Sequence, residues 1–185
     1  MGKTFYINFY DAIEIPKVNA LMAICTDIVH RENPDTLYFL FSSSGGSVDA
    51  GMVLYNFLKS LPVEVVMHNT GSIDSIATVV FLAGNKRYAA RHSAFLVHGI
   101  QWNFHQPTSL TIPQLREHVS RAKNDESKII SIYSEHTSLE KEEIISLFNE
   151  GESKGLEFAM DTGFISEIKD SAIPKGAPFF SVNLQ

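Results

Sequence analysis

Apolar and polar positions along the chain follow two different periods, which alternate from the N-terminus onward. Thr4–Phe9 alternates as a strand does, and Thr36–Phe41 and Val63–Met67 are continuous apolar runs of the kind that a sheet buries on both faces. Between these strands the apolar residues recur with a helical period. One helix is predicted to begin at Pro16, because proline is well tolerated in a first turn, and another to span Val48–Leu58. The inward side chains predicted for the second helix are Val53, Leu54, Phe57 and Leu58.

The middle of the chain continues the alternation. A polar turn leads into a wholly apolar stretch, which predicts a buried helix that opens at Ser75 and is closed by Gly84. Two short strands follow, at Arg87–Ala90 and Ala94–His98. This β-α-β-α-β-α order predicts an α/β fold with parallel strands joined by right-handed crossovers.

The C-terminal half has a different character. Residues 101–113 are predicted to form a polar loop or irregular hairpin, followed by a long helix from about Pro113 to Glu135. Apolar residues are sparse in the first half of this helix, so we expect that half to project from the domain. The Pro-rich residues 170–185 are predicted to form an extended tail. At 185 residues, the whole chain, 1–185, is expected to be one domain.

Composition narrows the possible functions. The net charge of −6 argues against nucleic-acid binding, which needs clustered Lys and Arg, and the apolar runs are too short to cross a membrane. Cys25 is the single cysteine, so no intrachain disulfide forms, and the first residues lack the pattern of a signal peptide. We therefore expect a cytoplasmic protein. No cofactor or metal site is predicted.

The candidate chemistry lies at the predicted ends of strands. Ligands of parallel α/β sheets bind beyond the carboxyl ends of the strands, and Gly45-Gly46, Ser75 and His98 all fall there. A histidine can take the proton of a serine hydroxyl, because its ordinary pKa is near neutrality. The backbone amides at the start of the helix after Ser75, together with those of the Gly-Gly loop, suit a developing oxyanion. Each residue also has a structural alternative: Ser75 as a helix N-cap, His98 as a hydrogen-bonded structural histidine, and Gly45-Gly46 as a tight turn.

The order and spacing of these motifs resemble the Clp protease proteolytic subunit (ClpP) family. The matching segments are Ser43-Ser44-Gly45-Gly46, Gly71-Ser72-Ile73-Asp74-Ser75, Phe95-Leu96-Val97-His98, His136-Thr137 and the run from Ala159 to Ile168. The resemblance covers the chain from about Tyr6 to Ile168. It implies the ClpP/crotonase-like fold, a β-α-β superhelix in which the long helix is a projecting handle.

The resemblance also implies roles for individual residues. Ser75 is expected to be the nucleophile of a serine endopeptidase and His98 its general base. The amides of Ile76 and of Gly45 or Gly46 are expected to hold the oxyanion. The substrate would be a short or unfolded polypeptide, whose extended chain could pair with the backbone at 45–48.

Two positions depart from the family pattern. A triad histidine is normally oriented by a carboxylate, and counting forward without gaps places the family's aspartate on Gly151, which has no side chain. The neighbouring Glu152 is the tentative replacement, with Glu150 as its rival; the alternative is that both are solvated surface charges. The second departure is Asp74, which stands directly before Ser75 and could cap the helix or contact His98.

The implied partners are further copies of the chain, assembled into stacked rings around a chamber. The resemblance also implies an ATP-driven unfoldase as a partner. Against its docking stands the start of the chain close to the first strand, which we expect to lack the longer segment that forms the family's axial loops. Two other functions stay open. One is a catalytically weak or inactive structural or peptide-binding subunit, and the other, less favoured, is a crotonase-like acyl-CoA enzyme.

Overall fold

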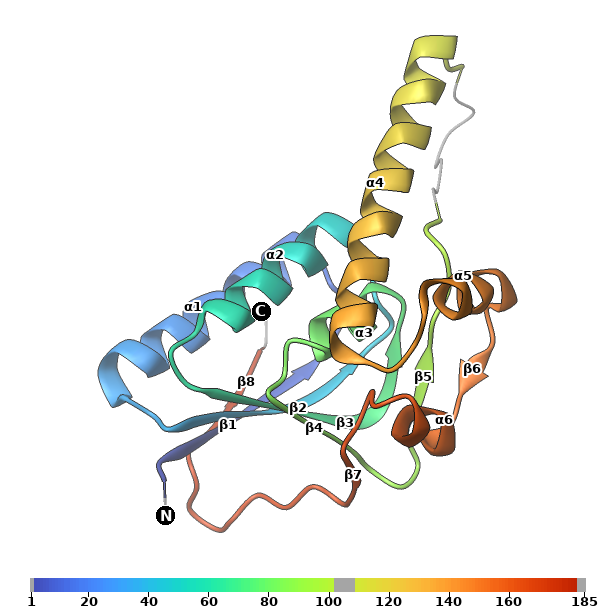
Figure 1. The fold of residues 1–185 in the computed structure, drawn as a ribbon. Helices are drawn as coiled ribbons and strands as arrows, with labels where there is room; N and C mark the ends of the chain where they lie inside the picture. Colours follow the sequence, from blue (N-terminus) through green and yellow to red (C-terminus); the bar gives the residue numbers. More distant parts are fainter. Residues whose placement is uncertain (1, 102–108, 183–185) are drawn as a thin grey trace.

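The computed structural model describes residues 2–101 and 109–182. It contains one mainly parallel sheet, with helices stacked on one face and one long helix that projects away from the body (Figure 1). The strands are β1 (Thr4–Tyr10), β2 (Thr36–Ser43), β3 (Glu64–Asp74), β4 (Lys86–Ala89), β5 (Ala94–Leu96), β6 (Ser153–Lys154), β7 (Glu167–Ile168) and β8 (Phe179–Ser181). The helices are α1 (Ile15–Glu32), α2 (Val48–Ser60), α3 (Ile76–Phe81), α4 (Ile112–His136), α5 (Lys141–Glu150) and α6 (Leu156–Asp161).

The sheet is organised around β3. Its strand order is β6-β5-β3-β2-β1-β8, and β4 also pairs with β3 and with β7. The long β3 serves two partners in turn: Val66–Asn69 pairs with β4, and Ser72–Asp74 pairs with β5. The strands β3 and β5 therefore end side by side, and Ser75 directly follows one of these ends. The predicted α/β fold with parallel strands is confirmed.

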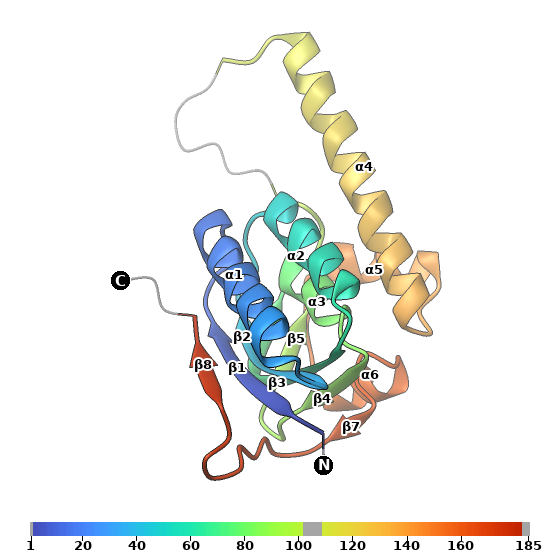
Figure 2. The same ribbon diagram turned by 90° about the vertical axis from the view of Figure 1, so that its left-hand side faces the viewer.

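Helices α1 and α2 lie together on one face of the sheet (Figure 2). The face that α2 turns inward carries Ala50, Leu54, Tyr55 and Leu58, spaced at helical intervals. The prediction that Val53 points inward is wrong, because its residue surface is 53% exposed. Val53 lies about 200° around the helix from Tyr55, on the far side of Leu54, and this moves it off the buried stripe.

Helix α4 confirms the predicted change of character along its length. The apolar residues of its first half, Ile112, Leu115 and Val119, are exposed, whereas Ile129, Ile132 and Tyr133 are buried where the helix meets the body. The helix begins with a capping box: Thr111 Oγ1 accepts from the amide of Gln114, whose side chain accepts from the amide of Thr111. The expected loop or hairpin falls largely on residues 102–108, outside the described residues.

The predicted tail is extended, and its end joins the sheet as a strand. In β8, Phe179 pairs in parallel with Tyr6 of β1, so the outer edge of β1 is covered by the same chain. Helix α5 and the short β6, which were not predicted, connect α4 to the last elements. Strand β6 pairs antiparallel with β5, which brings the end of α5 close to the strand that precedes His98. None of the helices within 2–101 and 109–182 is both long and apolar enough to span a membrane.

Candidate active site

Ser75 occupies the single residue between β3 and α3, and its backbone is in an unusual conformation. Its φ is 57° and its ψ is −132°, which is uncommon for a residue with a side chain and costs on the order of 1–3 kcal/mol. The amide of Ser75 donates to the carbonyl of Leu96 on β5, at 2.8 Å. This bond extends the β3–β5 pairing through the turn, so the strand that leads to His98 also holds Ser75.

The capping alternative for Ser75 is not realised. Ser75 stands at the N-cap position of α3, but its side chain makes no capping hydrogen bond. The short α3 is instead fixed by Thr78, whose amide and hydroxyl both donate to the carbonyl of Ser75. The hydroxyl of Ser75 therefore faces a pocket without being used to complete the helix.

The Gly45-Gly46 loop lies directly against Ser75. A Cβ atom on Gly45 would lie 2.7 Å from the Cβ of Ser75 and 2.8 Å from the carbonyl oxygen of Asp74. The φ of Gly45 is +86°, which side chains rarely adopt. Both the contact and the backbone conformation therefore require glycine. The alternative that Gly45-Gly46 only makes a tight turn does not account for the contact of Gly45 with Ser75.

The hydrogen bonds of the loop distinguish the two glycine amides. The amide of Gly45 donates to Ser43 Oγ, at 3.2 Å. The loop pairs with Ile13 through the carbonyl of Gly45 and the amide of Ser47, at 2.7 and 2.8 Å, so this pairing does not use the amide of Gly46. Of the two glycine amides proposed from the sequence, that of Gly46 is the one without a bond among the described residues.

His98 follows β5, and a backbone carbonyl orients its ring. Its Nδ1 atom lies 2.7 Å from the carbonyl oxygen of Gly99. A carbonyl oxygen can only accept, so Nδ1 carries the proton and Nε2 is left as an acceptor in the neutral ring. A general base needs this tautomer.

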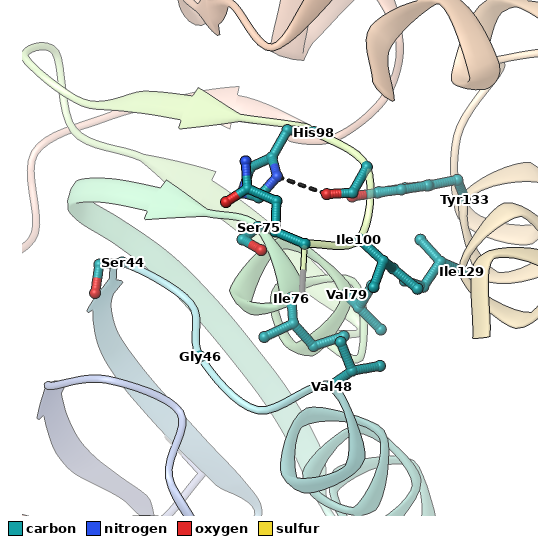
Figure 3. Close-up of a pocket in the computed structure, with 12 residues that line it drawn as sticks. Ser44, Gly46, Val48, Ser75, Ile76, Val79, His98, Ile100, Ile129 and Tyr133 are labelled. Carbon is teal, nitrogen blue, oxygen red and sulfur yellow. Dashed lines mark hydrogen bonds between the residues drawn. The ribbon is translucent and has the colours of Figure 1, made fainter. Parts of the chain in front are cut away.

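Ser75 and His98 line one pocket of about 250 Å³, together with Ser44 and Gly46. Figure 3 shows Ser75 and His98 beside the loop of Gly46, with Ile129 and Tyr133 facing them from α4. No hydrogen bond joins Ser75 to His98 among those that the described residues make. The apolar side chains that line the pocket are Val48, Ile76, Val79, Ile100, Ile129 and Tyr133.

Tyr133 connects the handle helix to the serine turn, a link that the sequence did not reveal. Its hydroxyl lies 2.5 Å from Thr78 Oγ1. Since Thr78 donates to the carbonyl of Ser75, Tyr133 is the donor to Thr78. Complete burial raises the pKa of Tyr133 far above its usual value, so the phenol stays protonated and keeps donating. The sequence feature that could have indicated this contact is the position of Tyr133 in the apolar half of α4.

The structure does not bring Glu152 to His98. The side chain of Glu152 is 74% exposed and lies 3.8 Å from Lys154 Nζ, which also binds Glu150 at 2.7 Å. Gly151 ends α5 in the left-handed conformation, with φ +61°, and no atom lies within 4 Å of where its Cβ would be. The β5–β6 pairing ends at Leu96 and Ser153, and continuing its register by two residues would set Gly151 opposite His98. The position next in register to the histidine is thus one without a side chain.

Asp74 contacts neither of the partners considered for it. Its carboxylate accepts a hydrogen bond of 2.5 Å from the hydroxyl of Ser72, the serine that precedes it by two residues. Ser72 is therefore a partner of Asp74 in the strand. Among residues 2–101 and 109–182, no three His, Cys, Asp or Glu side chains are grouped so that they could hold a metal ion.

A family model described as Clp protease matches residues 2–172. The chain belongs to the Clp protease family. Among curated relatives, ATP-dependent Clp protease proteolytic subunit 1 of Leifsonia xyli subsp. xyli is 24% identical over 157 residues, covering 84% of this chain and 78% of that protein. The protein of the same name from Chlamydia pneumoniae is 31% identical over 104 residues, or 55% and 53% of the two chains. ATP-dependent Clp protease proteolytic subunit 2 of Pseudomonas aeruginosa is 27% identical over 112 residues, or 60% and 54%.

Membership of the Clp protease family confirms the resemblance seen in the sequence and implies a serine peptidase at the level of the family. The matched region includes every candidate residue of the site, from Gly45 to Glu152. The carbonyl of Gly99 as the partner of His98 was not anticipated. Every residue has a backbone carbonyl, so residue types alone do not indicate which carbonyl binds His98.

Proposed function

We propose that this Clp protease family member is a serine endopeptidase that hydrolyses peptide bonds through Ser75 and His98. The observation that carries the proposal is the Ser75 turn, whose hydroxyl is not used as a cap and lines the same pocket as His98. Gly45 is packed against this turn, and the tautomer of His98 leaves Nε2 as an acceptor.

The first half of the reaction is acylation. Ser75 Oγ attacks the carbonyl carbon of the scissile peptide bond while His98 Nε2 takes the hydroxyl proton. The amides of Gly46 and Ile76 donate to the oxyanion that forms. The C–N bond then breaks, His98 returns the proton to the leaving amine, and an acyl ester remains on Ser75.

The second half is hydrolysis of that ester. A water molecule gives a proton to His98 Nε2 and attacks the acyl carbon, and the ester oxygen leaves as Ser75 regains its proton. Through both halves the carbonyl of Gly99 holds Nδ1–H. This carbonyl is neutral, so it stabilises the imidazolium less than a carboxylate would. We therefore expect turnover to be slow for a serine peptidase.

We further propose that copies of the chain assemble through α4 into an oligomer that encloses the sites. Ile112, Leu115 and Val119 recur on α4 at intervals of three and four residues and are exposed. Apolar residues at this spacing form one stripe, which a second copy would cover. Light scattering coupled to gel filtration tests this assembly, and Leu115→Lys together with Val119→Lys should reduce the mass. Cytoplasmic location and docking of an ATP-driven unfoldase stay untested predictions.

The decisive experiment is labelling with a fluorophosphonate, detected by intact mass, on the wild-type chain and on Ser75→Ala and His98→Ala. Such a probe forms an adduct only with an activated serine. We expect the adduct on the wild type and on neither variant. A folded wild-type protein that forms no adduct would overturn the peptidase proposal.

That negative outcome would favour a second function, a peptide-binding or structural subunit of the same family. The observation in its favour is Gly151, which leaves His98 without a carboxylate partner. In this case peptides would bind the pocket and remain intact. The crotonase-like activity has no such observation to support it.

A further inference from the structure

A second hollow adjoins the Ser75–His98 pocket. Its volume is about 350 Å³, and it shares Gly46, Val48 and Ile100 with the first pocket. Its remaining walls are polar: Ser47 and Gln101 are uncharged, whereas Asp49 at the start of α2 and Arg121 and Asp125 on α4 are charged. Figure 1 shows this end of α2 beside the middle of α4. The two hollows thus form one groove along the Gly46–Val48 backbone.

One face of α4 forms a wall along the whole groove. Arg121, Asp125, Ile129 and Tyr133 are four residues apart, so they lie above one another on the same side of the helix. The lower two line the pocket of Ser75, and the upper two line the second hollow. The groove therefore changes from apolar to charged within about one helical turn.

Asp125 is the unusual member of this stripe. It is only 7% exposed, which is rare for a carboxylate. Its recorded partner is Lys128, whose ammonium donates to Oδ1 at 2.9 Å. A carboxylate can accept about four hydrogen bonds, so with this one bond among residues 2–101 and 109–182 Asp125 retains acceptor capacity toward the hollow.

Arg121 does not neutralise Asp125. Its guanidinium is bound to the carboxylate of Asp49 across the hollow, which joins α4 to α2. The three charged side chains that line the hollow carry a net charge of −1, and Lys128, which is paired with Asp125, is not part of the lining. Asp125 would repel an acidic ligand, whereas a cationic ligand would donate a further hydrogen bond to its carboxylate.

We propose that the hollow is a subsite for a basic side chain of an extended peptide. The proposal rests on the proposed function, because it takes the apolar pocket as the seat of a substrate side chain next to the scissile bond. Four residues of helix rise about 6 Å, and two residues of extended chain span about 6.6 Å. A lysine or arginine two residues from the side chain in the apolar pocket therefore reaches Asp125.

The test measures binding, so that it does not depend on catalysis. The Ser75→Ala chain is titrated with fluorescent hexapeptides that carry one leucine and, two residues before or after it, lysine, alanine or glutamate. We expect the lysine peptide to bind about tenfold more tightly than the glutamate peptide at one of these positions. Lysine placed one residue from the leucine is the positional control, because that side chain points to the opposite side of an extended peptide.

Two variants should change the preference in opposite directions. Asp125→Asn keeps the shape of the side chain and removes its charge, and should abolish the preference for lysine. Arg121→Gln frees Asp49 and makes the hollow more negative, so it should increase the preference. Glu117→Gln, an exposed position on α4 outside both hollows, removes the same charge as Asp125→Asn and should leave the preference unchanged.

The outcomes separate this proposal from the previous one. Equal binding of lysine and glutamate peptides, or a lysine preference that is the same at the control position, overturns the subsite. A lysine preference that persists in a folded Asp125→Asn chain also overturns the subsite. If Asp125→Asn fails to fold, an Arg121→Gln chain whose lysine preference does not increase overturns it instead. A wild-type chain without fluorophosphonate labelling but with the position-dependent preference would retain the subsite and lose the peptidase.

Discussion

Two regions contact β5, the Ser75 turn and the α5–β6 connection, and they make different contributions to the site. At the Ser75 turn, a strand-to-strand hydrogen bond, an unusual backbone conformation and a glycine loop in contact with the serine all act together. At the α5–β6 connection, a Cβ atom on Gly151 would have open space around it, and Glu152 is exposed to solvent. The serine side of the site is built by backbone, whereas the acid side depends on one side chain that is absent.

This difference shows which part of such a site a single substitution can change. The Ser75 turn is held by main-chain bonds to β5 and by close packing, so a change there displaces several atoms at once. The Gly151 position contacts nothing within 4 Å, so a side chain could be added or removed without disturbing the neighbouring elements. The following predictions test the two regions against each other.

The largest expected effect is that of Gly45→Ala. The added methyl group would lie 2.7 Å from the Cβ of Ser75, so the loop and the serine must separate. A displacement of this order can cost about 100-fold in rate, and we expect that loss in fluorophosphonate labelling. Gly155→Ala is the control, since nothing lies within 4 Å of its Cβ and its φ is −85°. Equal labelling of the two variants would show that the loop does not position Ser75.

A smaller effect, of opposite sign, is expected from Gly151→Asp. A carboxylate facing His98 would stabilise the imidazolium, and we expect peptide hydrolysis to become about tenfold faster or more. The left-handed φ of +61° makes the substitution cost about 1 kcal/mol in stability.

Gly151→Asn is the matched control for that gain, because it has the same shape without the charge. Hydrolysis rates measured on both variants separate the two effects. If asparagine accelerates the reaction as much as aspartate, the charge is not what His98 lacks.

Tyr133→Phe should weaken the serine side more mildly. It leaves Thr78 without its donor from α4, which should cost about 1 kcal/mol in the free energy of unfolding and lower the labelling rate several-fold. Tyr55→Phe removes a comparable bond, to His136 at 2.8 Å, away from the pocket. Chemical denaturation should show similar losses for both, and labelling a loss for Tyr133→Phe alone.

The smallest effect expected is a pH dependence of stability that involves neither region. His68 is buried between the hydroxyl of Tyr38 and the carbonyl of Lys169, at 2.7 and 2.9 Å. Burial lowers the pKa of His68 below its usual 6.5. The unfolded chain therefore binds a proton that the folded chain does not, and stability should fall as the pH drops below about 6.5.

Urea unfolding at about pH 8 and about pH 5.5 measures this fall, and His68→Gln should reduce it. Burial also lowers the pKa of His136, so part of the fall should remain in that variant. A fall of the same size in the wild type and in His68→Gln would remove His68 from the explanation.

The elements with strong periodicity were predictable from the sequence. The buried strands of the centre, the helices α1, α2 and α4, and the projection of the first half of α4 all follow from runs of apolar residues and their spacing. Helix α5 was missed, as were β6 and β8, which are two and three residues long and are defined by their partners in the sheet. Such short strands carry too few residues for a period to be seen.

The candidate site was predictable in its residue types and not in its orientations. Ser75, His98 and Gly45-Gly46 were placed by motif order, and they converge because β3 and β5 end together. The amide that stays unbonded, the carbonyl that orients His98 and the exposure of Glu152 depend on backbone geometry, which residue types do not encode. Asp125 lies among polar neighbours near the middle of α4, and only the packing of α4 against the body shows that it is buried.

The pairing of β8 with β1 has a consequence for how the protein is made. Tyr6 leaves the ribosome early and Phe179 late, yet they are neighbours in the finished sheet. Strands β1, β2 and β3 can form from one continuous N-terminal stretch as it emerges, because domains fold from the residues already available. Until the tail arrives, the outer edge of β1 presents unpaired backbone groups, which invite pairing with other chains. Addition of β8 is thus the step that ends this vulnerable period of synthesis.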